Sequence, residues 1–131
     1  MVLELTSGGH ATLLQEAAAA HPRECCGLLL GEGLRISEVR PAANVHPLPE
    51  RHFEIDPAAL IAAHRAARSG GPQVLGYYHS HPTGRAEPSA TDRAQASGDG
   101  RIWTIIAQGK VLCWRDEPDG FAALPLRVAA G

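Results

Sequence analysis

Two histidines separated by one residue, His79 and His81, are the side chains in the sequence best suited to bind a metal ion together. They follow a run of aromatic and branched residues, which favours a β-strand, and residues two apart in a strand point to the same face. Asp92 lies a short distance further on and can supply a carboxylate as a third ligand. A zinc ion with three protein ligands keeps its fourth position open for water, and such a site suits hydrolysis. The spacing therefore predicts a zinc hydrolase centre.

Ser89 and Asp92 also have a second interpretation. A serine followed three residues later by an acidic residue is typical of a capping box that opens a helix. The two interpretations are compatible, because the histidine pair, Pro82 and the serine-acid pair occur in one stretch and in a workable order. Taken alone, the serine-acid pair favours the cap, and the two interpretations together fit the whole stretch better than either one does.

This stretch resembles the signature of the JAMM (MPN+) metalloproteases: an upstream glutamate, then His-[Ser/Thr]-His, seven residues, Ser, two residues and Asp. The chain reads His79-Ser80-His81, seven residues, Ser89, two residues and Asp92. The resemblance implies that His79, His81 and Asp92 bind one zinc ion per chain. It also implies that Ser89 donates a hydrogen bond to the oxyanion of the tetrahedral intermediate.

A hydrolase of this kind also needs a general base, and physical chemistry alone does not select one among the fourteen acidic residues. Members of the family carry this glutamate just before a strand of Gly-Leu-Leu-x-Gly type. Glu24 holds that position, ahead of Cys25-Cys26 and the segment Gly27 to Gly31. The resemblance therefore makes Glu24 the catalytic base; without it, Glu24 would be interpreted as a solvated residue at a strand edge.

The elements around these residues predict an α/β (α+β) fold with a central, mainly antiparallel sheet and two or three helices. Apolar spacing, turn residues and cap signals divide the chain. We expect helices over 10–20, 57–68 and 89–96, and strands over 25–30, 34–40, 53–55, 74–79, 102–107, 110–115 and 121–128. The resemblance implies a JAMM/MPN-like (cytidine-deaminase-like) fold, with residues 1–131 as a single domain.

Composition argues against several classes of partner. The formal net charge is -2 and the basic residues are scattered, so nucleic acid is not an expected ligand. No stretch approaches the roughly 20 apolar residues of a membrane span, and the N-terminus lacks a signal-peptide pattern. Three cysteines, two of them adjacent, do not form a paired disulfide framework. These features predict a cytoplasmic protein with reduced thiols; the sequence does not predict its oligomeric state.

The resemblance extends to the substrate. Little chain separates Asp92 from the strand expected at 102–107, so the long insertion of the eukaryotic deubiquitinases is missing. The chain is similar to the compact prokaryotic members, which implies cleavage after the C-terminal Gly-Gly of ubiquitin-like or sulfur-carrier proteins. Arg85 and Glu87, in the loop between the ligands, either touch substrate or are merely solvated.

Three other functions compete with this interpretation. Cys25 or Cys26 as a nucleophile with His79 as its base would give a thiol hydrolase, but cysteines in an apolar run usually pack as small hydrophobes. A non-catalytic MPN-type interaction module is disfavoured by the intact ligand set. A general small-peptide metallopeptidase remains the alternative within the same chemistry.

Overall fold

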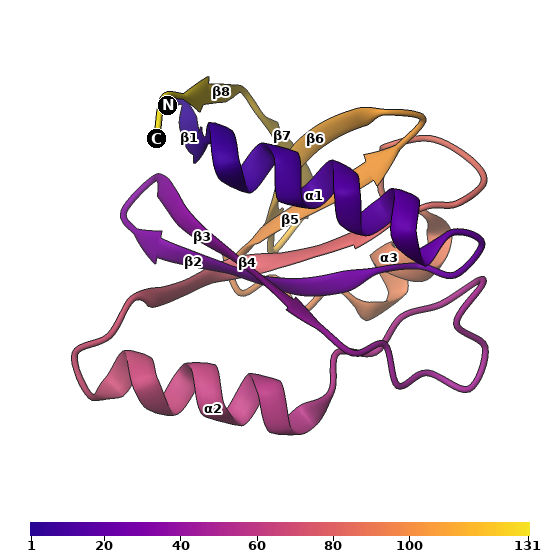
Figure 1. Cartoon of the computed structure of the whole chain (residues 1–131), viewed down its shortest axis with the longest axis horizontal. Helices are drawn as coiled ribbons and strands as arrows, with labels where there is room; N and C mark the ends of the chain where they lie inside the picture. The colour runs from indigo at the N-terminus through magenta and orange to yellow at the C-terminus, as the bar shows by residue number, and fades with distance from the viewer.

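An eight-stranded sheet and three helices form the structure, a computed structural model that describes residues 1–131 (Figure 1). The strand order is β7-β6-β5-β4-β2-β3-β1-β8. The pairs β1–β3, β1–β8 and β4–β5 are parallel, and the other four are antiparallel. The prediction of a mainly antiparallel α+β fold is confirmed. The elements are β1 (Leu3–Thr6), α1 (Ser7–Ala20), β2 (Cys26–Glu32), β3 (Arg35–Ala42), α2 (Pro57–Arg68), β4 (Gln73–Ser80), α3 (Ala90–Gln95), β5 (Ile102–Ala107), β6 (Lys110–Glu117), β7 (Gly120–Leu124) and β8 (Leu126–Ala129).

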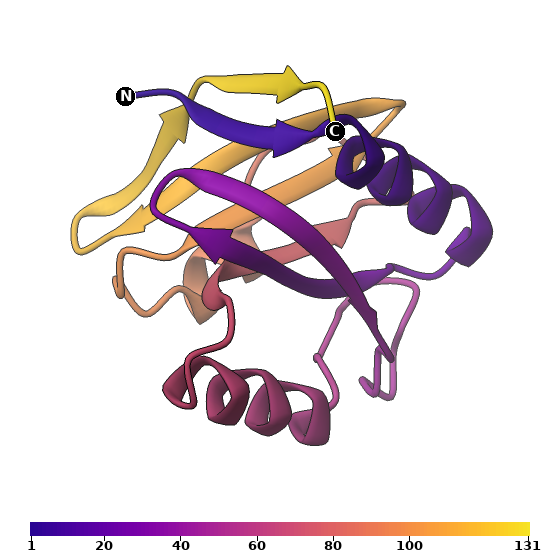
Figure 2. The ribbon, with the colours of Figure 1, turned by 60° about the vertical axis from the view of Figure 1, so that its left-hand side comes forward.

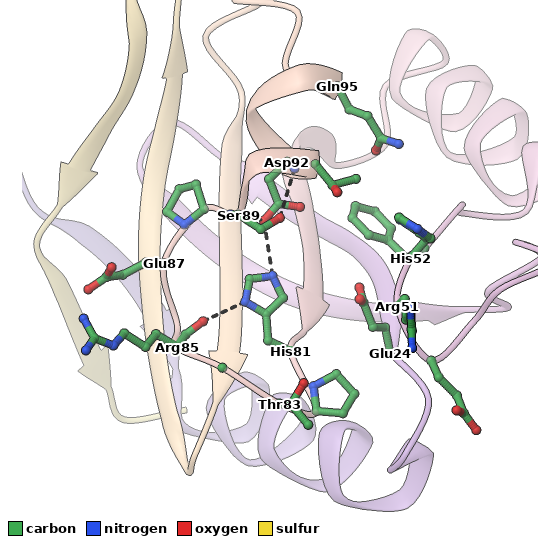
Figure 3. A pocket seen from close by; sticks show the side chains of 16 residues that line it. Glu24, Arg51, His52, His81, Thr83, Arg85, Glu87, Ser89, Asp92 and Gln95 are labelled. Carbon is green, nitrogen blue, oxygen red and sulfur yellow. Dashed lines mark hydrogen bonds and ion pairs between the residues drawn. The ribbon is translucent and has the colours of Figure 1, made fainter.

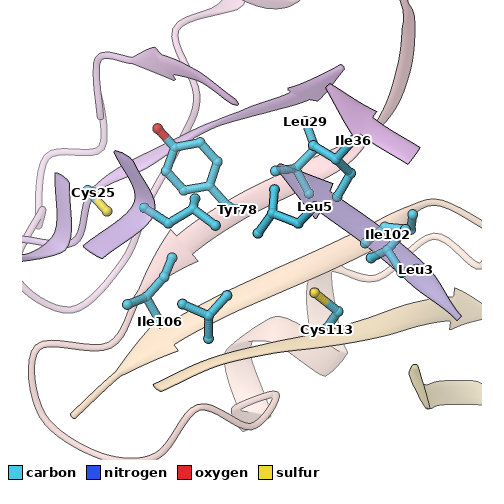
Figure 4. Close-up of a cluster of buried hydrophobic side chains, with 11 residues drawn as sticks. Leu3, Leu5, Cys25, Leu29, Ile36, Tyr78, Ile102, Ile106 and Cys113 are labelled. Atoms are coloured by element: carbon cyan, nitrogen blue, oxygen red, sulfur yellow. The ribbon is translucent and has the colours of Figure 1, made fainter. Parts of the chain in front are cut away.

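Helices α1 and α2 cover opposite faces of the sheet (Figures 1 and 2). On the α1 face, Leu13 joins the largest cluster of buried side chains, which includes Leu29 and Tyr78 (Figure 4). On the α2 face, Ala63 packs in a second cluster with Leu28. Strand β2 is therefore buried on both faces, which explains why its sequence is a continuous apolar run rather than an alternation.

Local signals fix the ends of α2 as the sequence predicts. The Asp56 carboxylate accepts a hydrogen bond from the N–H of Ala58 at 3.0 Å, and Pro57 occupies the first helical position. The helix ends at Arg68, before Gly70 takes a left-handed conformation. None of the helices is both long and apolar enough to cross a bilayer.

The strand predicted over 53–55 is wrong. Only a single bridge joins Ile55 to Asn44. The amide side chain of Asn44, rather than a neighbouring strand, holds this segment, because it makes four hydrogen bonds to surrounding backbone groups. One of them runs from Nδ2 to the carbonyl oxygen of Glu24, at 3.0 Å. Phe53 is thereby free to pack elsewhere.

The last strand predicted over 121–128 is two strands, β7 and β8, at opposite ends of the sheet order. Pro125 separates them, since proline has no N–H to donate to a strand ladder. Strand β1 was not predicted, because four residues give too short a pattern to recognise. Helix α1 also begins earlier than predicted, at Ser7, with the Thr6 side chain accepting from the N–H of Gly9.

Candidate metal centre

His79 and His81 lie at the end of β4, between β2 and β5 in the sheet. His79 pairs with Cys26 on one side and Ile105 on the other, and it is 1% exposed. The N–H of His81 donates to the carbonyl of Ile106 at 2.9 Å, so the extended course continues one residue past the strand. The two imidazoles therefore face one another, with Nε2 atoms 3.1 Å apart.

Asp92 reaches the histidines from α3, and the capping box at the start of that helix directs it. The Ser89 Oγ accepts from the N–H of Asp92 at 3.1 Å, and the Asp92 Oδ2 accepts from the N–H of Ser89 at 2.9 Å. The Asp92 carboxylate lies 3.1 Å from Nε2 of His79 and 3.2 Å from Nε2 of His81. The capping interpretation is confirmed, and the cap also aims the carboxylate at the histidines.

The charges of this cluster follow from burial and from its own contacts. Burial lowers the pKa of His79 and outweighs the attraction of Asp92. Burial opposes protonation of His81 too, but the Asp92 carboxylate and the Arg85 carbonyl raise the pKa of His81 overall. Although burial raises it, hydrogen bonds from both imidazoles hold the pKa of Asp92 well below its usual range. The cluster thus contains an ionised carboxylate beside a buried imidazole that favours its neutral form.

The donor set fits a small divalent cation. Nδ1 of His81 lies 2.6 Å from the carbonyl of Arg85, and in neutral His81 its donation to that oxygen leaves a lone pair on Nε2 (Figure 3). Bonds of about 2.0–2.1 Å in a tetrahedron place ligand atoms roughly 3.3 Å apart. The observed separations of 3.1–3.2 Å are close to that value. His79, His81 and Asp92 form a group able to hold a metal ion.

Glu24 faces the same cleft from the residue pair that precedes β2 (Figure 3). It is 7% exposed, and burial, with a smaller contribution from the charge of Asp92, raises the pKa of Glu24 to about 7. Ser80 links it to the histidines, because its Oγ accepts from the N–H of Cys25 at 2.9 Å and its own N–H donates to the Cys25 carbonyl at 3.1 Å. The serine between the two histidines therefore fixes the strand end that carries Glu24.

The cleft has a volume of about 570 Å³ and is lined mostly by polar residues. Residues 50–53 form one wall and residues 81–85 and 87–89 the other, with α3 beside them. Arg85 and Glu87 both line the cleft. The backbone carbonyl of Arg85, rather than its side chain, makes the contact with His81.

Phe53 belongs to the site although the sequence did not identify it. Its ring stacks on the His79 imidazole, with ring centroids 4.2 Å apart and an angle of 16° between the planes. Trp103 presents its edge to the same imidazole at 5.8 Å. These contacts restrict rotation of His79. The only sequence signal was the aromatic residue itself, in a segment interpreted as a strand.

The cysteine-nucleophile hypothesis has no support in the structure. Cys25 and Cys26 are buried and free. Burial raises the pKa of Cys25, and it raises the pKa of Cys26 to about 12. The Sγ of Cys26 contacts the carbonyl oxygens of Ala42 and Ala43. A thiolate nucleophile needs the opposite shift.

Comparison with known proteins identifies the class to which this fold and site belong. A family model described as prokaryotic homologs of the JAB domain matches residues 7–117. The chain is 34% identical over 115 residues to a desampylase of Haloferax volcanii, covering 86% of this chain and 83% of that protein. It is 42% identical over 86 residues to a probable TtuB-protein conjugate cleaving protease of Thermus thermophilus, covering 66% of this chain and 55% of that protein.

Solved structures show the same fold. The solution structure of protein DSY2949 from Desulfitobacterium hafniense has a TM-score of 0.86 and 29% identity, covering 99% of this chain and 94% of that one. A structure described as a metalloprotease-like JAMM zinc site in the proteasome and signalosome has a TM-score of 0.59 and 21% identity, covering 97% of this chain and 99% of that one. The chain therefore belongs to the prokaryotic JAB (JAMM/MPN+) family, as its motif implied.

Replacing Glu24 by glutamine should stabilise the metal-free protein, and more so at higher pH. Because burial raises the pKa of Glu24 to about 7, the folded metal-free chain binds this proton more tightly than the unfolded chain does. Its free energy of unfolding therefore falls as pH rises from the ordinary glutamate range to about 7, and the loss persists above that pH. Thermal unfolding at about pH 5 and about pH 8 measures the effect, since these values lie on either side of the shifted pKa. We expect Glu24→Gln to raise the midpoint by several degrees at the higher pH and by less at the lower.

Glu50→Gln is the matched control, because Glu50 is an exposed glutamate that lines the same cleft. An equal change with Glu50→Gln, or a difference between Glu24→Gln and wild type that does not grow with pH, would contradict burial as the cause.

Proposed function

We propose that this protein is a zinc-dependent hydrolase that cleaves the amide bond following the C-terminal Gly-Gly of ubiquitin-like or sulfur-carrier proteins. One observation carries the proposal: the ligand atoms of His79, His81 and Asp92 lie 3.1–3.2 Å from one another, in the cleft that Glu24 also lines. Two imidazole nitrogens and one carboxylate oxygen are a donor set that suits zinc, with one ion per chain. The complete set argues against a purely structural module.

When bound, the zinc ion would polarise the scissile carbonyl and activate the attacking water. Glu24 acts as the general base: its carboxylate takes a proton from the water and passes it to the leaving nitrogen. The first step needs Glu24 as a carboxylate, and the second needs the same group as the carboxylic acid that the first step forms. The proton therefore moves between groups that line one cleft.

Ser89 is proposed to stabilise the oxyanion. Its Oγ accepts the N–H of Asp92, which uses one lone pair and leaves the hydroxyl hydrogen free to donate. A donor aimed at the developing negative charge acts more strongly in a partly buried site than in water. Capping of α3 and oxyanion binding therefore use different parts of the same hydroxyl group.

Two kinds of support favour a protein tail as the substrate. The relatives are named a desampylase and a protease that cleaves TtuB-protein conjugates. The cleft lies between two loop walls, and a substrate backbone made of glycines can approach the metal site closely because glycine has no side chain. The folded body of a carrier protein would add binding energy at a distance from the scissile bond.

We place the enzyme in the cytoplasm, which the three free cysteines favour.

Substitutions should separate the proposed roles. Glu24→Gln should retain zinc and fold but lower kcat by about 10²–10⁴, since it removes the proton acceptor. Ser89→Ala should lower kcat by roughly 10²–10³ or less. Unchanged turnover in Glu24→Gln would remove the assignment of Glu24 as the base.

His79→Ala or His81→Ala should lose zinc, because each variant lacks one of the three proposed ligands. Elemental analysis measures the zinc content. Unchanged zinc content in both histidine variants would remove the ligand assignment.

The substrate can be tested with a small ubiquitin-like carrier extended beyond its Gly-Gly, compared with a free peptide of the same tail. We expect faster cleavage of the carrier after Gly-Gly, followed by mass spectrometry, with Glu24→Gln as the inactive control. A carrier with alanine in place of the last glycine should be cut more slowly, because a Cβ hinders close backbone approach. Equal cleavage of peptide and carrier would favour the general peptidase, and cleavage of neither by zinc-loaded enzyme would contradict an autonomous hydrolase.

A further inference from the structure

The loop that follows His81 is held by three side chains through three consecutive carbonyl oxygens. Two of these side chains come from the β5–β6 hairpin, outside the metalloprotease motif. The contacts are Gln108 Nε2 to Gly84 O at 3.0 Å, His81 Nδ1 to Arg85 O at 2.6 Å and Trp114 Nε1 to Ala86 O at 3.4 Å. The hairpin therefore holds the loop on both sides of the carbonyl that contacts the proposed ligand.

Gln108 makes its contact from an unfavourable backbone conformation. Its φ of 53° makes it the only residue other than glycine with a positive φ in the chain. With Gly109, at φ 73°, it forms the two-residue turn between Ala107 and Lys110. Turns with two positive φ values prefer Asn-Gly or Gly-Gly, so the turn geometry alone does not favour glutamine there. Its side chain is long enough to reach Gly84, which offers a reason for its presence.

We propose that Gln108 is a positioning residue for the metal centre, an inference that rests on the proposed role of His81 as a ligand. The Gly84 carbonyl belongs to the peptide unit that ends at Arg85, and the Arg85 carbonyl belongs to the next unit. A hydrogen bond that holds the first unit in place therefore limits the orientations open to the Arg85 carbonyl. The Arg85 carbonyl in turn keeps the proton of neutral His81 on Nδ1 (Figure 3). The Nε2 lone pair then faces His79 and Asp92, as binding a cation requires.

The loop has little else to hold this orientation. Thr83, Gly84 and Arg85 are exposed, and Gly84 has a φ of 109°, a conformation open to rearrangement. Ala86, by contrast, is buried against Ile105 and Ala107. Loss of the Gln108 contact would therefore free the part of the loop nearest His81 while its far end stays anchored.

The experiment compares Gln108→Gly and Gln108→Glu with wild type. Glycine suits the positive φ and removes the amide, so the metal-free protein should unfold at the same temperature or higher. Glutamate has the same size as glutamine and the same difficulty in adopting a positive φ, but its carboxylate accepts hydrogen bonds where the amide of glutamine donates one. Gln73→Glu is the matched control, because the Gln73 amide also donates to a carbonyl, that of Ala67, at the opposite end of β4 from His79.

Two readouts separate positioning from stability. Imidazole ¹⁵N shifts in the metal-free protein, at a pH high enough for His81 to be neutral, report which nitrogen of His81 carries the proton. Chelator competition gives the zinc Kd. We expect a mixed His81 tautomer and about tenfold weaker zinc binding in both Gln108 variants, the size typical of lost outer contacts to a metal ligand. Gln73→Glu should match wild type in both.

An unchanged tautomer and Kd in the two Gln108 variants would overturn the inference; if one variant fails to fold, the other decides. Equal zinc affinity in wild type and His81→Ala is a different outcome, because it would overturn the proposed metal centre itself. The two failures are therefore distinguishable.

Discussion

The structure depends on one electrostatic constraint: two imidazole nitrogens and a carboxylate lie 3.1–3.2 Å from one another, and the His79 and Asp92 side chains are buried. Such atoms present lone pairs, and groups of this kind are stable together only with a proton or a cation between them. An unpaired buried charge costs on the order of several kcal/mol. The surrounding elements must therefore hold the three groups close together, and a divalent ion is a natural partner for that arrangement.

The fold meets this constraint by giving each group an independent support. His79 lies in the interior of the sheet and is stacked on Phe53. Asp92 is aimed by the capping box of α3, and His81 by the carbonyl of Arg85. Ser80 ties the strand that carries the histidines to the segment that carries Glu24. Strand, helix and loop each contribute one part of the site, and each part is held in place by its own contacts.

The sequence predicted those parts of the site that depend on local rules. The period of two along a strand placed His79 and His81 together, and the cap signal placed Asp92; their catalytic and ligand roles remain predictions. The contacts that Phe53 and Gln108 make at the site could not be predicted, because they join segments distant in the chain, which no local pattern reveals. The same holds for the fold. The sequence predicted the helices that have cap signals, but it did not predict the break at Pro125 or the four-residue strand β1.

The most direct test of the central claim is diffraction at the zinc absorption edge from crystals of zinc-loaded protein. The account predicts one strong anomalous peak per chain, about 2.0–2.2 Å from Nε2 of His79, Nε2 of His81 and a carboxylate oxygen of Asp92. A stoichiometric zinc peak held by other residues, or no peak between these three side chains in zinc-saturated crystals, would contradict it.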